Sequence, residues 1–146
     1  MAEYFGKRIV GGRGEGPAIV TRMPVNFTAA FTKIQNIFPG RRAEIRDRHH
    51  DLFGKNIQGS VLVFPTCIGS THSGLVLLEI SYRKVAPAAM IVRAADSLLA
   101  SGAILGQVWY GRGIPLIEYH NDDFYDSVRP GDFIQIDGDS GKISIL

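Results

Sequence analysis

The chain is constrained first by what it lacks. It has one cysteine, Cys67, among 146 residues, so it cannot form an internal disulfide or supply an all-cysteine metal site. Its 16 basic and 14 acidic side chains leave a formal charge of +2, which is too small to indicate nucleic acid or an anionic membrane as a partner. No apolar run is long enough to span a bilayer, and residues 1–10 lack the apolar core of a signal peptide. We therefore expect a cytoplasmic protein that binds neither nucleic acid nor a membrane.

Histidine is also scarce, and its distribution argues against a metal site. The four histidines, His49, His50, His72 and His120, show no metal-ligand spacing with a carboxylate or thiol. We expect no metal to be bound by this chain alone. The remaining composition, 45% hydrophobic and 21% charged, is typical of one soluble globular domain with a substantial core.

Short β-branched runs separated by glycine predict an α/β domain with a mixed β-sheet and short helices. The predicted strands are residues 17–27, 60–64, 88–92, 103–105, 108–110 and 115–119, followed by a hairpin of 132–137 and 142–146. The predicted helices are residues 71–82, 96–100 and 121–127, and Ser70 or Thr71 could cap the first of them. The spacing of Phe31, Ile34, Ile37 and Phe38 also indicates a helical turn, which Pro39-Gly40 would end.

The segment from Phe64 to Gly74 is the candidate site. It joins an apolar strand to an apolar helix through Gly69-Ser70-Thr71-His72-Ser73, which is rich in small and hydroxyl residues. A helix N-terminus presents unpaired N–H groups and a favourable dipole to an anion, so a substrate carboxylate or phosphate would fit there. Gly69 would let a ligand approach the backbone closely. The alternative is an ordinary turn between a strand and a helix, with Cys67 as a small core or loop thiol.

Taken in order along the chain, these pieces resemble the small subunit of the aconitase X family, which is equivalent to the swivelling domain of aconitase. The resemblance covers nearly the whole chain and rests on these segments: Gly12-Arg13-Gly14-Glu15-Gly16-Pro17-Ala18-Ile19-Val20, His50-Asp51-Leu52-Phe53-Gly54, Gly69-Ser70-Thr71-His72-Ser73, Ala86-Pro87-Ala88-Ala89, Ile114-Pro115, and Gly131-Asp132 with Asp137-Gly138. It implies a single swivelling β/β/α domain over residues 1–146, with a possible inserted segment at 28–50. The chain departs from the family where a glycine-arginine pair is replaced by Cys67-Ile68.

The resemblance implies that the chain is half of a hydro-lyase. A separate large subunit would hold an iron–sulfur cluster and complete the site, and this chain alone would bind no cofactor and be inactive. Ser70 matches the proton-accepting serine of the family, with Gly69, Thr71, His72 and Ser73 expected around a small carboxylate substrate. The apolar side chains of 28–50 and the faces around Gly69 would contact the large subunit.

Two substrates compete within that family. One reading is dehydration of cis-3-hydroxy-L-proline, which we favour because the chain lacks the Lys- and Glu-rich composition of archaeal hyperthermophiles. The alternatives are the small subunit of phosphomevalonate dehydratase, or a swivelling and binding module without catalysis of its own.

Overall fold

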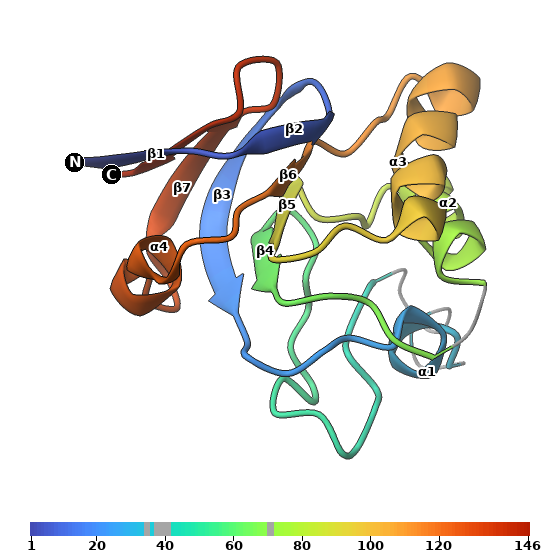
Figure 1. Ribbon diagram of the computed structural model, residues 1–146. Coiled ribbons are helices and arrows are strands. Elements are labelled where there is room, and N and C mark those ends of the chain that lie inside the picture. The colour runs from blue at the N-terminus through green and yellow to red at the C-terminus, as the bar shows by residue number, and fades with distance from the viewer. Residues whose placement is uncertain (34–35, 37–41, 70–71) are drawn as a thin grey trace.

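The computed structural model describes residues 1–33, 36, 42–69 and 72–146, which form a curled sheet with helices packed against one side (Figure 1). The strands are β1 (Ala2–Phe5), β2 (Lys7–Val10), β3 (Arg13–Val20), β4 (Val61–Phe64), β5 (Ala89–Val92), β6 (Leu116–Glu118), β7 (Phe133–Asp137) and β8 (Lys142–Ile145). The helices are α1 (Phe27–Phe31), α2 (Ser73–Tyr82), α3 (Ser97–Tyr110) and α4 (Asp122–Ser127). This arrangement confirms the expected α/β class with a mixed sheet.

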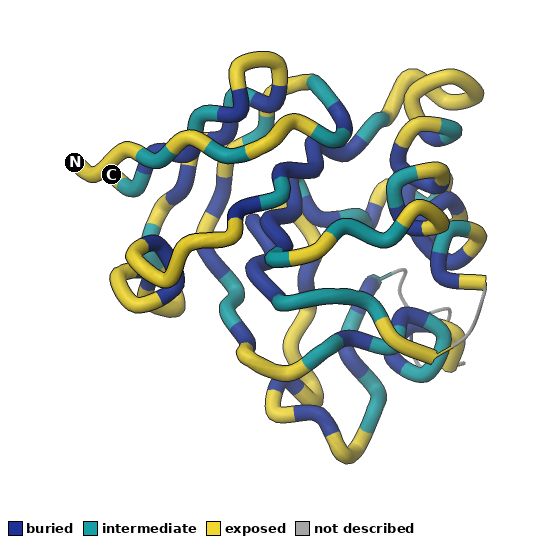
Figure 2. Tube along the Cα trace, viewed as in Figure 1, coloured by how far each residue is buried: buried dark blue, intermediate teal, exposed yellow. Residues whose placement is uncertain are grey.

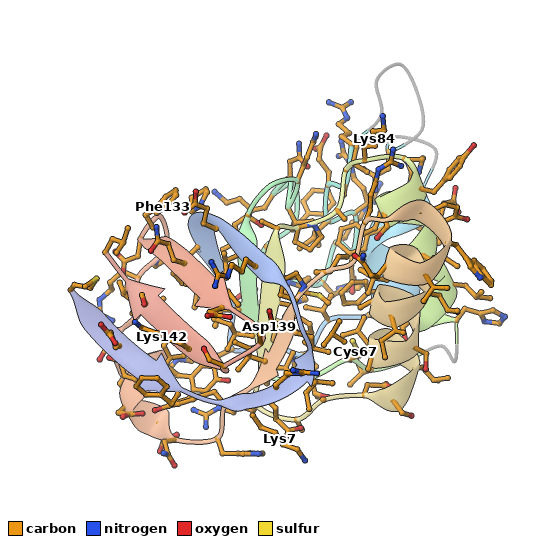
Figure 3. All side chains as sticks on the ribbon, turned by 90° about the horizontal axis from the view of Figure 1, so that it is seen from above. Lys7, Cys67, Lys84, Phe133, Asp139 and Lys142 are labelled. Atoms are coloured by element: carbon orange, nitrogen blue, oxygen red, sulfur yellow. The ribbon has the colours of Figure 1, made fainter. Side chains whose placement is uncertain are left out.

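The N-terminal segment closes the sheet into a barrel. The strand order is β1-β8-β7-β3-β4-β5-β6-β2, so the two edge strands are β1 and β2, which only Gly6 separates in sequence. A Cβ at Gly6 would lie 2.5 Å from Cγ2 of Ile117 and 2.9 Å from the carbonyl oxygen of Glu118, so glycine is required where this segment crosses β6. Figure 3, seen from above, shows the strands curled around a common interior.

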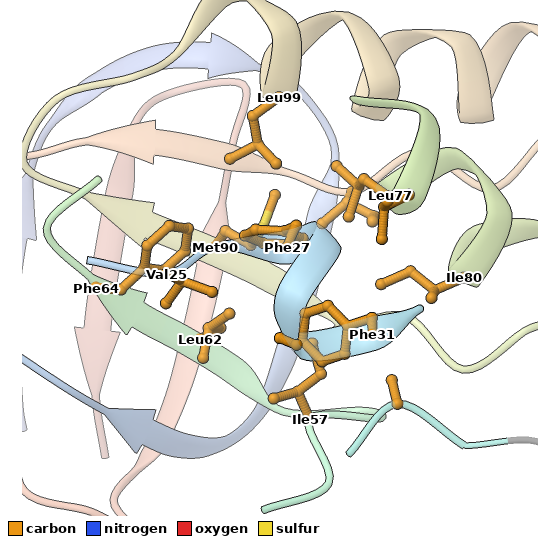
Figure 4. Close-up of a cluster of buried hydrophobic side chains, with 14 of the residues drawn as sticks. Val25, Phe27, Phe31, Ile57, Leu62, Phe64, Leu77, Ile80, Met90 and Leu99 are labelled. Atoms are coloured by element: carbon orange, nitrogen blue, oxygen red, sulfur yellow. The ribbon is translucent and has the colours of Figure 1, made fainter. Parts of the chain in front are cut away.

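The two faces of the central strands supply two separate hydrophobic cores. β4 and β5 are buried along their whole length, which is typical of parallel strands covered on both faces. Alternate residues, such as Val61 and Ile91, point into the barrel, where Phe124 and Tyr125 of α4 join the same cluster. The intervening residues, such as Leu62 and Met90, pack against the helices (Figure 4).

Several elements confirm the sequence-based expectations. β4, β5, β6, α4 and the β7–β8 hairpin lie where they were predicted, to within one or two residues. α2 begins at Ser73, inside the predicted range of 71–82, and the proposed caps Ser70 and Thr71 lie outside the described residues. Ile34, Ile37 and Phe38 lie outside them too, whereas Phe31 is the last residue of α1.

Two other expectations were wrong. Residues 103–105 and 108–110 are not strands, because α3 continues past residue 100 to Tyr110 and ends at Gly111, which is left-handed with φ +66°. The strand predicted for 17–27 ends at Val20, and Asn26 instead caps α1 by accepting a hydrogen bond from Ala29 N. In both places burial of an apolar face outweighs local propensity.

Candidate functional site

The candidate loop lies at the carboxyl edge of the parallel part of the sheet. β3, β4, β5 and β6 pair in parallel, so their carboxyl ends meet at one edge, and residues 65–69 leave the end of β4 there. The three helices α1, α2 and α3 each begin after one of these strands. Ligands of α/β sheets commonly bind outside the carboxyl ends of the strands, so the location suits a binding site.

A second segment, residues 21–26, is hydrogen-bonded to the loop. Val25 N donates to the carbonyl of Thr66 at 3.0 Å, and Ile68 N donates to the carbonyl of Val25 at 3.1 Å. These bonds form a short parallel bridge between Val25 and Cys67. The first half of the loop is therefore held against a neighbouring segment and is more than a free turn.

His50 and Asp51 fix that second segment in turn. The buried His50 ring places Nε2 3.1 Å from the carbonyl oxygen of Pro24, while its Nδ1 accepts from Leu52 N at 3.1 Å. Because a carbonyl oxygen can only accept, Nε2 is the donor to Pro24, and Nδ1 also lies 3.1 Å from Asp51 Oδ1. The Thr21 hydroxyl donates to Asp51 Oδ1 at 2.7 Å. The His-Asp-Leu motif thus holds residues 21–26, which in turn hold the candidate loop.

Gly69 adopts a backbone conformation that favours glycine, with φ +90°. A Cβ at this position would overlap the side-chain amide of Asn26, the residue that caps α1. The sequence predicted that a ligand approaches the backbone of Gly69 closely; in the structure the side chain of Asn26 does so. The part of Gly69 in substrate binding remains a prediction.

The start of α2 carries two of the predicted site residues. His72 is exposed and occupies the N-cap position without a side-chain capping hydrogen bond. Ser73 is only 2% exposed, and its Oγ is buried with no hydrogen-bond partner among the residues that the structure describes. A buried polar atom left unpaired costs about 1–3 kcal/mol, so this hydroxyl calls for an explanation. Ser70 and Thr71 lie outside the described residues.

Cys67 is a neutral thiol. Burial, with a smaller contribution from the Asp96 carboxylate, raises the pKa of Cys67 to about 12. The thiolate is the form that attacks substrates and binds metals, so Cys67 suits neither role near neutral pH. This supports the structural reading of Cys67 given by the sequence.

The sequence analysis missed polar residues on the adjacent loops at the same edge. Glu118 accepts hydrogen bonds from Ala95 N at 2.7 Å and from Nε2 of His120 at 2.8 Å. The Ala95 hydrogen bond is the main cause that lowers the pKa of Glu118. The Arg93 guanidinium lies 4.1 Å from the centre of the Tyr125 ring and donates to Asp122 at 2.7 Å. Glu118 and Arg93 lie at or just after the ends of predicted strands, and this position was the sequence signal that could have identified them.

Metal ligands are not gathered anywhere in the part of the chain that the structure describes. No group of three or more His, Cys, Asp or Glu side chains lies together there. Over the same residues, no helix is long and apolar enough to cross a membrane.

A barrel with a helical layer on one side and a loop site at its parallel edge defines an α/β domain, and comparison with known proteins identifies its class. The model of the aconitase X swivel domain family matches residues 3–145. The chain belongs to this family, which confirms the resemblance and the expected fold.

Named relatives and a solved structure extend over nearly the same length. The chain is 35% identical over 140 residues to the phosphomevalonate dehydratase small subunit of Methanocella arvoryzae, covering 96% of both chains. It is 31% identical to the protein of that name from Methanosarcina mazei, covering 99% of this chain and 91% of the relative. Aconitase X from Thermococcus kodakaraensis superimposes with a TM-score of 0.84 at 30% identity, covering 100% and 99% of the two chains. These dehydratase names agree with the expectation of a hydro-lyase subunit.

Proposed function

We propose that this chain is the small subunit of a phosphomevalonate dehydratase, which removes water from phosphomevalonate. The observation that carries the proposal is the match, over nearly the whole of both chains, to relatives named as this subunit. The sequence analysis favoured cis-3-hydroxy-L-proline on composition alone. The relatives favour the alternative, because their names give phosphomevalonate as the substrate.

Within this enzyme, Ser70 is the proposed proton acceptor. A serine hydroxyl is a poor base unless its surroundings stabilise the alkoxide. Two described features nearby support such a role: the start of α2, whose first N–H groups have no side-chain cap, and the buried, unpaired hydroxyl of Ser73. The helix N-terminus stabilises negative charge, whether on an alkoxide or on a substrate carboxylate.

The four residues around Ser70 have different proposed parts. Gly69 and Thr71 would contribute backbone N–H groups, and His72 is exposed at the helix start, where it can reach a substrate. Ser73 is buried in the first turn of α2, so we assign it to orienting the groups around it rather than to direct contact with substrate.

The iron–sulfur cluster belongs, in this proposal, to the large subunit. The described residues of this chain do not fit a cluster, because Cys67 is the one cysteine and burial together with Asp96 keeps it protonated. When bound, such a cluster supplies the Lewis acid for the leaving hydroxyl. What this chain contributes is the proton-accepting side and the helix terminus that holds negative charge.

The test is an assay of the assembled enzyme on both candidate substrates. The chain is co-expressed with the large subunit of the same organism, and water loss is measured from phosphomevalonate and from cis-3-hydroxy-L-proline. We expect the assembled enzyme to dehydrate phosphomevalonate but not cis-3-hydroxy-L-proline. Neither subunit should be active by itself. Turnover of cis-3-hydroxy-L-proline alone would restore the first reading, and an intact complex inactive on both would favour a binding module.

A further inference from the structure

Helices α2 and α3 form a layer that is almost free of charge. The 10 residues of α2 and the 14 residues of α3 include a single charged side chain, Glu79. A helix that covers a sheet normally carries charged residues on its outer side, whereas a helix that is apolar all round is normally buried on every side. The composition of this layer is therefore that of an internal layer.

Its outer side is nevertheless exposed in the isolated chain. We call the exposed apolar side chains of these helices the α2–α3 face; its members are Leu75, Tyr82, Leu98, Ile104, Val108, Trp109 and Tyr110. Leu75 is 61% exposed, Val108 70% and Trp109 60% (Figure 2 shows the outer turns of both helices as exposed). Large exposed apolar side chains gathered on two packed helices are typical of an interaction site.

Aromatic residues gather at one end of the face. The rings of Tyr82 and Tyr110 lie 5.2 Å apart, and those of Trp109 and Tyr110 lie 6.4 Å apart. Trp109 is the single tryptophan of the chain. Tryptophan and tyrosine are the residues most enriched among those that dominate protein–protein binding energy.

A groove runs beside this face. A cavity of about 390 Å³ lies between α3 and the turn after β2, and is lined by Val10, Gly11, Gly12, Ile104, Gln107, Val108 and Gly113. None of these side chains is charged. The groove can therefore accept an apolar side chain from a partner without leaving a buried charge unpaired.

The outer side of the barrel has the opposite character. The strands β3, β7 and β8 expose Arg13, Glu15, Asp137 and Lys142 in an open polar groove, and these side chains pair with one another or with neighbouring residues. Such a surface is suited to water. Apolar side chains such as Phe5 and Phe133 are exposed on the barrel too, so the helical layer differs from it in its lack of charge.

One end of the α2–α3 face lies at the start of α2, which follows the site loop. Leu75 and Leu98 lie in the first turns of α2 and α3, and these turns meet where Gly74 approaches the carbonyl oxygen of Leu98. Ile68 of that loop is itself exposed. A protein that covers the face therefore also reaches the site loop. This favours a partner that completes the site over a second copy of this chain, which would set two identical loops together and add no missing group.

We propose that the α2–α3 face, together with the groove beside α3, is the docking surface for the large subunit, which would present a complementary apolar surface with few charges. This inference rests on the proposed function for the existence of that subunit. Of the apolar residues expected to form this contact from residues 28–50, Phe31 is 1% exposed and belongs to the core of this chain, and Ile34, Ile37 and Phe38 lie outside the described residues.

Binding of the large subunit, measured by calorimetry, tests the proposal without needing activity. Val108→Glu and Trp109→Glu each place a charge on the face, and we expect each to weaken binding by about 30-fold or more, as for a central interface residue. The matched control is Phe5→Glu, since Phe5 is 66% exposed on the barrel and pairs across the strands with Lys142. It should bind within about twofold of the unchanged chain, as expected for a residue outside the interface. Circular dichroism checks that each variant is folded.

The outcomes separate this proposal from the proposed function. The docking surface would be overturned if Val108→Glu and Trp109→Glu bound the large subunit as tightly as the unchanged chain does. It would also be overturned if Phe5→Glu weakened binding as much as they do. Neither result would affect the proposed function. A chain that is dimeric alone, and that Trp109→Glu makes monomeric without weakening large-subunit binding, would assign the face to a second copy instead. A complex that depends on Val108 and Trp109 but does not dehydrate phosphomevalonate would refute the function and keep the surface. Failure of the unchanged chain to bind any large subunit would overturn both.

Discussion

Gly74 and Gly102 face each other where α2 and α3 cross, and the backbone of each helix occupies the space of the other's missing side chain. A Cβ at Gly74 would overlap the carbonyl oxygen of Leu98, and a Cβ at Gly102 would overlap the carbonyl oxygen of Gly74. Both contacts are with backbone, so neither can be relieved by turning a side chain. The close approach of the two helices therefore depends on both glycines.

Gly102→Ala should destabilise the chain although alanine is the better helix former. The helix-propensity gain is about 1 kcal/mol, while overpacking costs about 1–3 kcal/mol or more when backbone must move. We expect a net loss of stability in urea unfolding and weaker large-subunit binding, because the α2–α3 face would be distorted. Ser101→Ala, on the exposed side of the same helix, is the control and should change little. A stabilised Gly102→Ala chain would show that the helices separate freely.

Ser70→Ala should remove most of the turnover of the assembled enzyme while leaving the fold and the complex intact. Loss of a general base lowers the rate by about 10²–10⁴-fold, whereas loss of a helix cap costs about 1 kcal/mol of stability. Steady-state kinetics and a thermal melt therefore distinguish the two roles.

Ser73→Ala is the comparison for that variant. It removes a buried hydroxyl that has no partner, so we expect unchanged or higher stability and a smaller loss of kcat. Near-normal kcat in folded Ser70→Ala, with loss in Ser73→Ala or His72→Ala, would transfer the proton-accepting role away from Ser70.

Cys67 should resist alkylation at neutral and mildly alkaline pH. Its pKa of about 12 leaves little thiolate near pH 8, where an unfolded cysteine is already reactive. Asp96→Asn keeps a capping side chain for α3 but removes the charge, so it should lower the pKa of Cys67 and speed its labelling by iodoacetamide. The effect should be partial, because burial is the larger cause of the raised pKa.

The same shift gives the sign of a stability effect. Between about pH 9 and 12 the unfolded chain loses the Cys67 proton and the folded chain keeps it, so stability falls as pH rises through this range. Cys67→Ala should lack this part of the decline in unfolding free energy. Rapid labelling of the folded chain at pH 8 would contradict a partly buried, neutral thiol.

His50→Ala should destabilise the segment that supports the site. It leaves the Pro24 carbonyl and the Leu52 N–H without their partner, at about 1–3 kcal/mol each. Because residues 21–26 hold the loop through Val25, we expect a lower melting temperature and a higher KM. The neighbouring His49 is exposed, so His49→Ala is the matched control. Equal melting temperatures for the two variants would remove His50 from this role.

The elements predicted from sequence share a clear hydrophobic period or a distinct turn. β7 alternates exposed and buried residues and is followed by Gly138-Asp139-Ser140-Gly141, so the hairpin follows from local signals alone. In α3 the signals conflict: Gly102 suggests a helix end, and Ile104 to Tyr110 is rich in β-branched and aromatic residues. Only the packing of Gly102 against Gly74 shows that the helix continues.

The position of the candidate loop was predictable from the sequence, but the residues that contact it were not. A strand followed by small and hydroxyl residues and then a helix located the loop, because that order is itself the signal. Asn26, Glu118 and Asp96 come from segments distant in sequence, and no local pattern relates them to Gly69 or Cys67. Their contribution depends on parallel strands aligning their carboxyl ends, which is a property of the fold.

The closure of the barrel by β1 and β2 also constrains when the chain can fold. Ala2 pairs with Ile145 across β1 and β8, so β1 has as its partner a strand about 140 residues later in the sequence. Figure 1 shows the two ends of the chain side by side. Contacts between residues so far apart in sequence slow folding and leave strand edges open until they form. A growing chain would therefore carry β1 without its partner until β8 has been made and is free to pair.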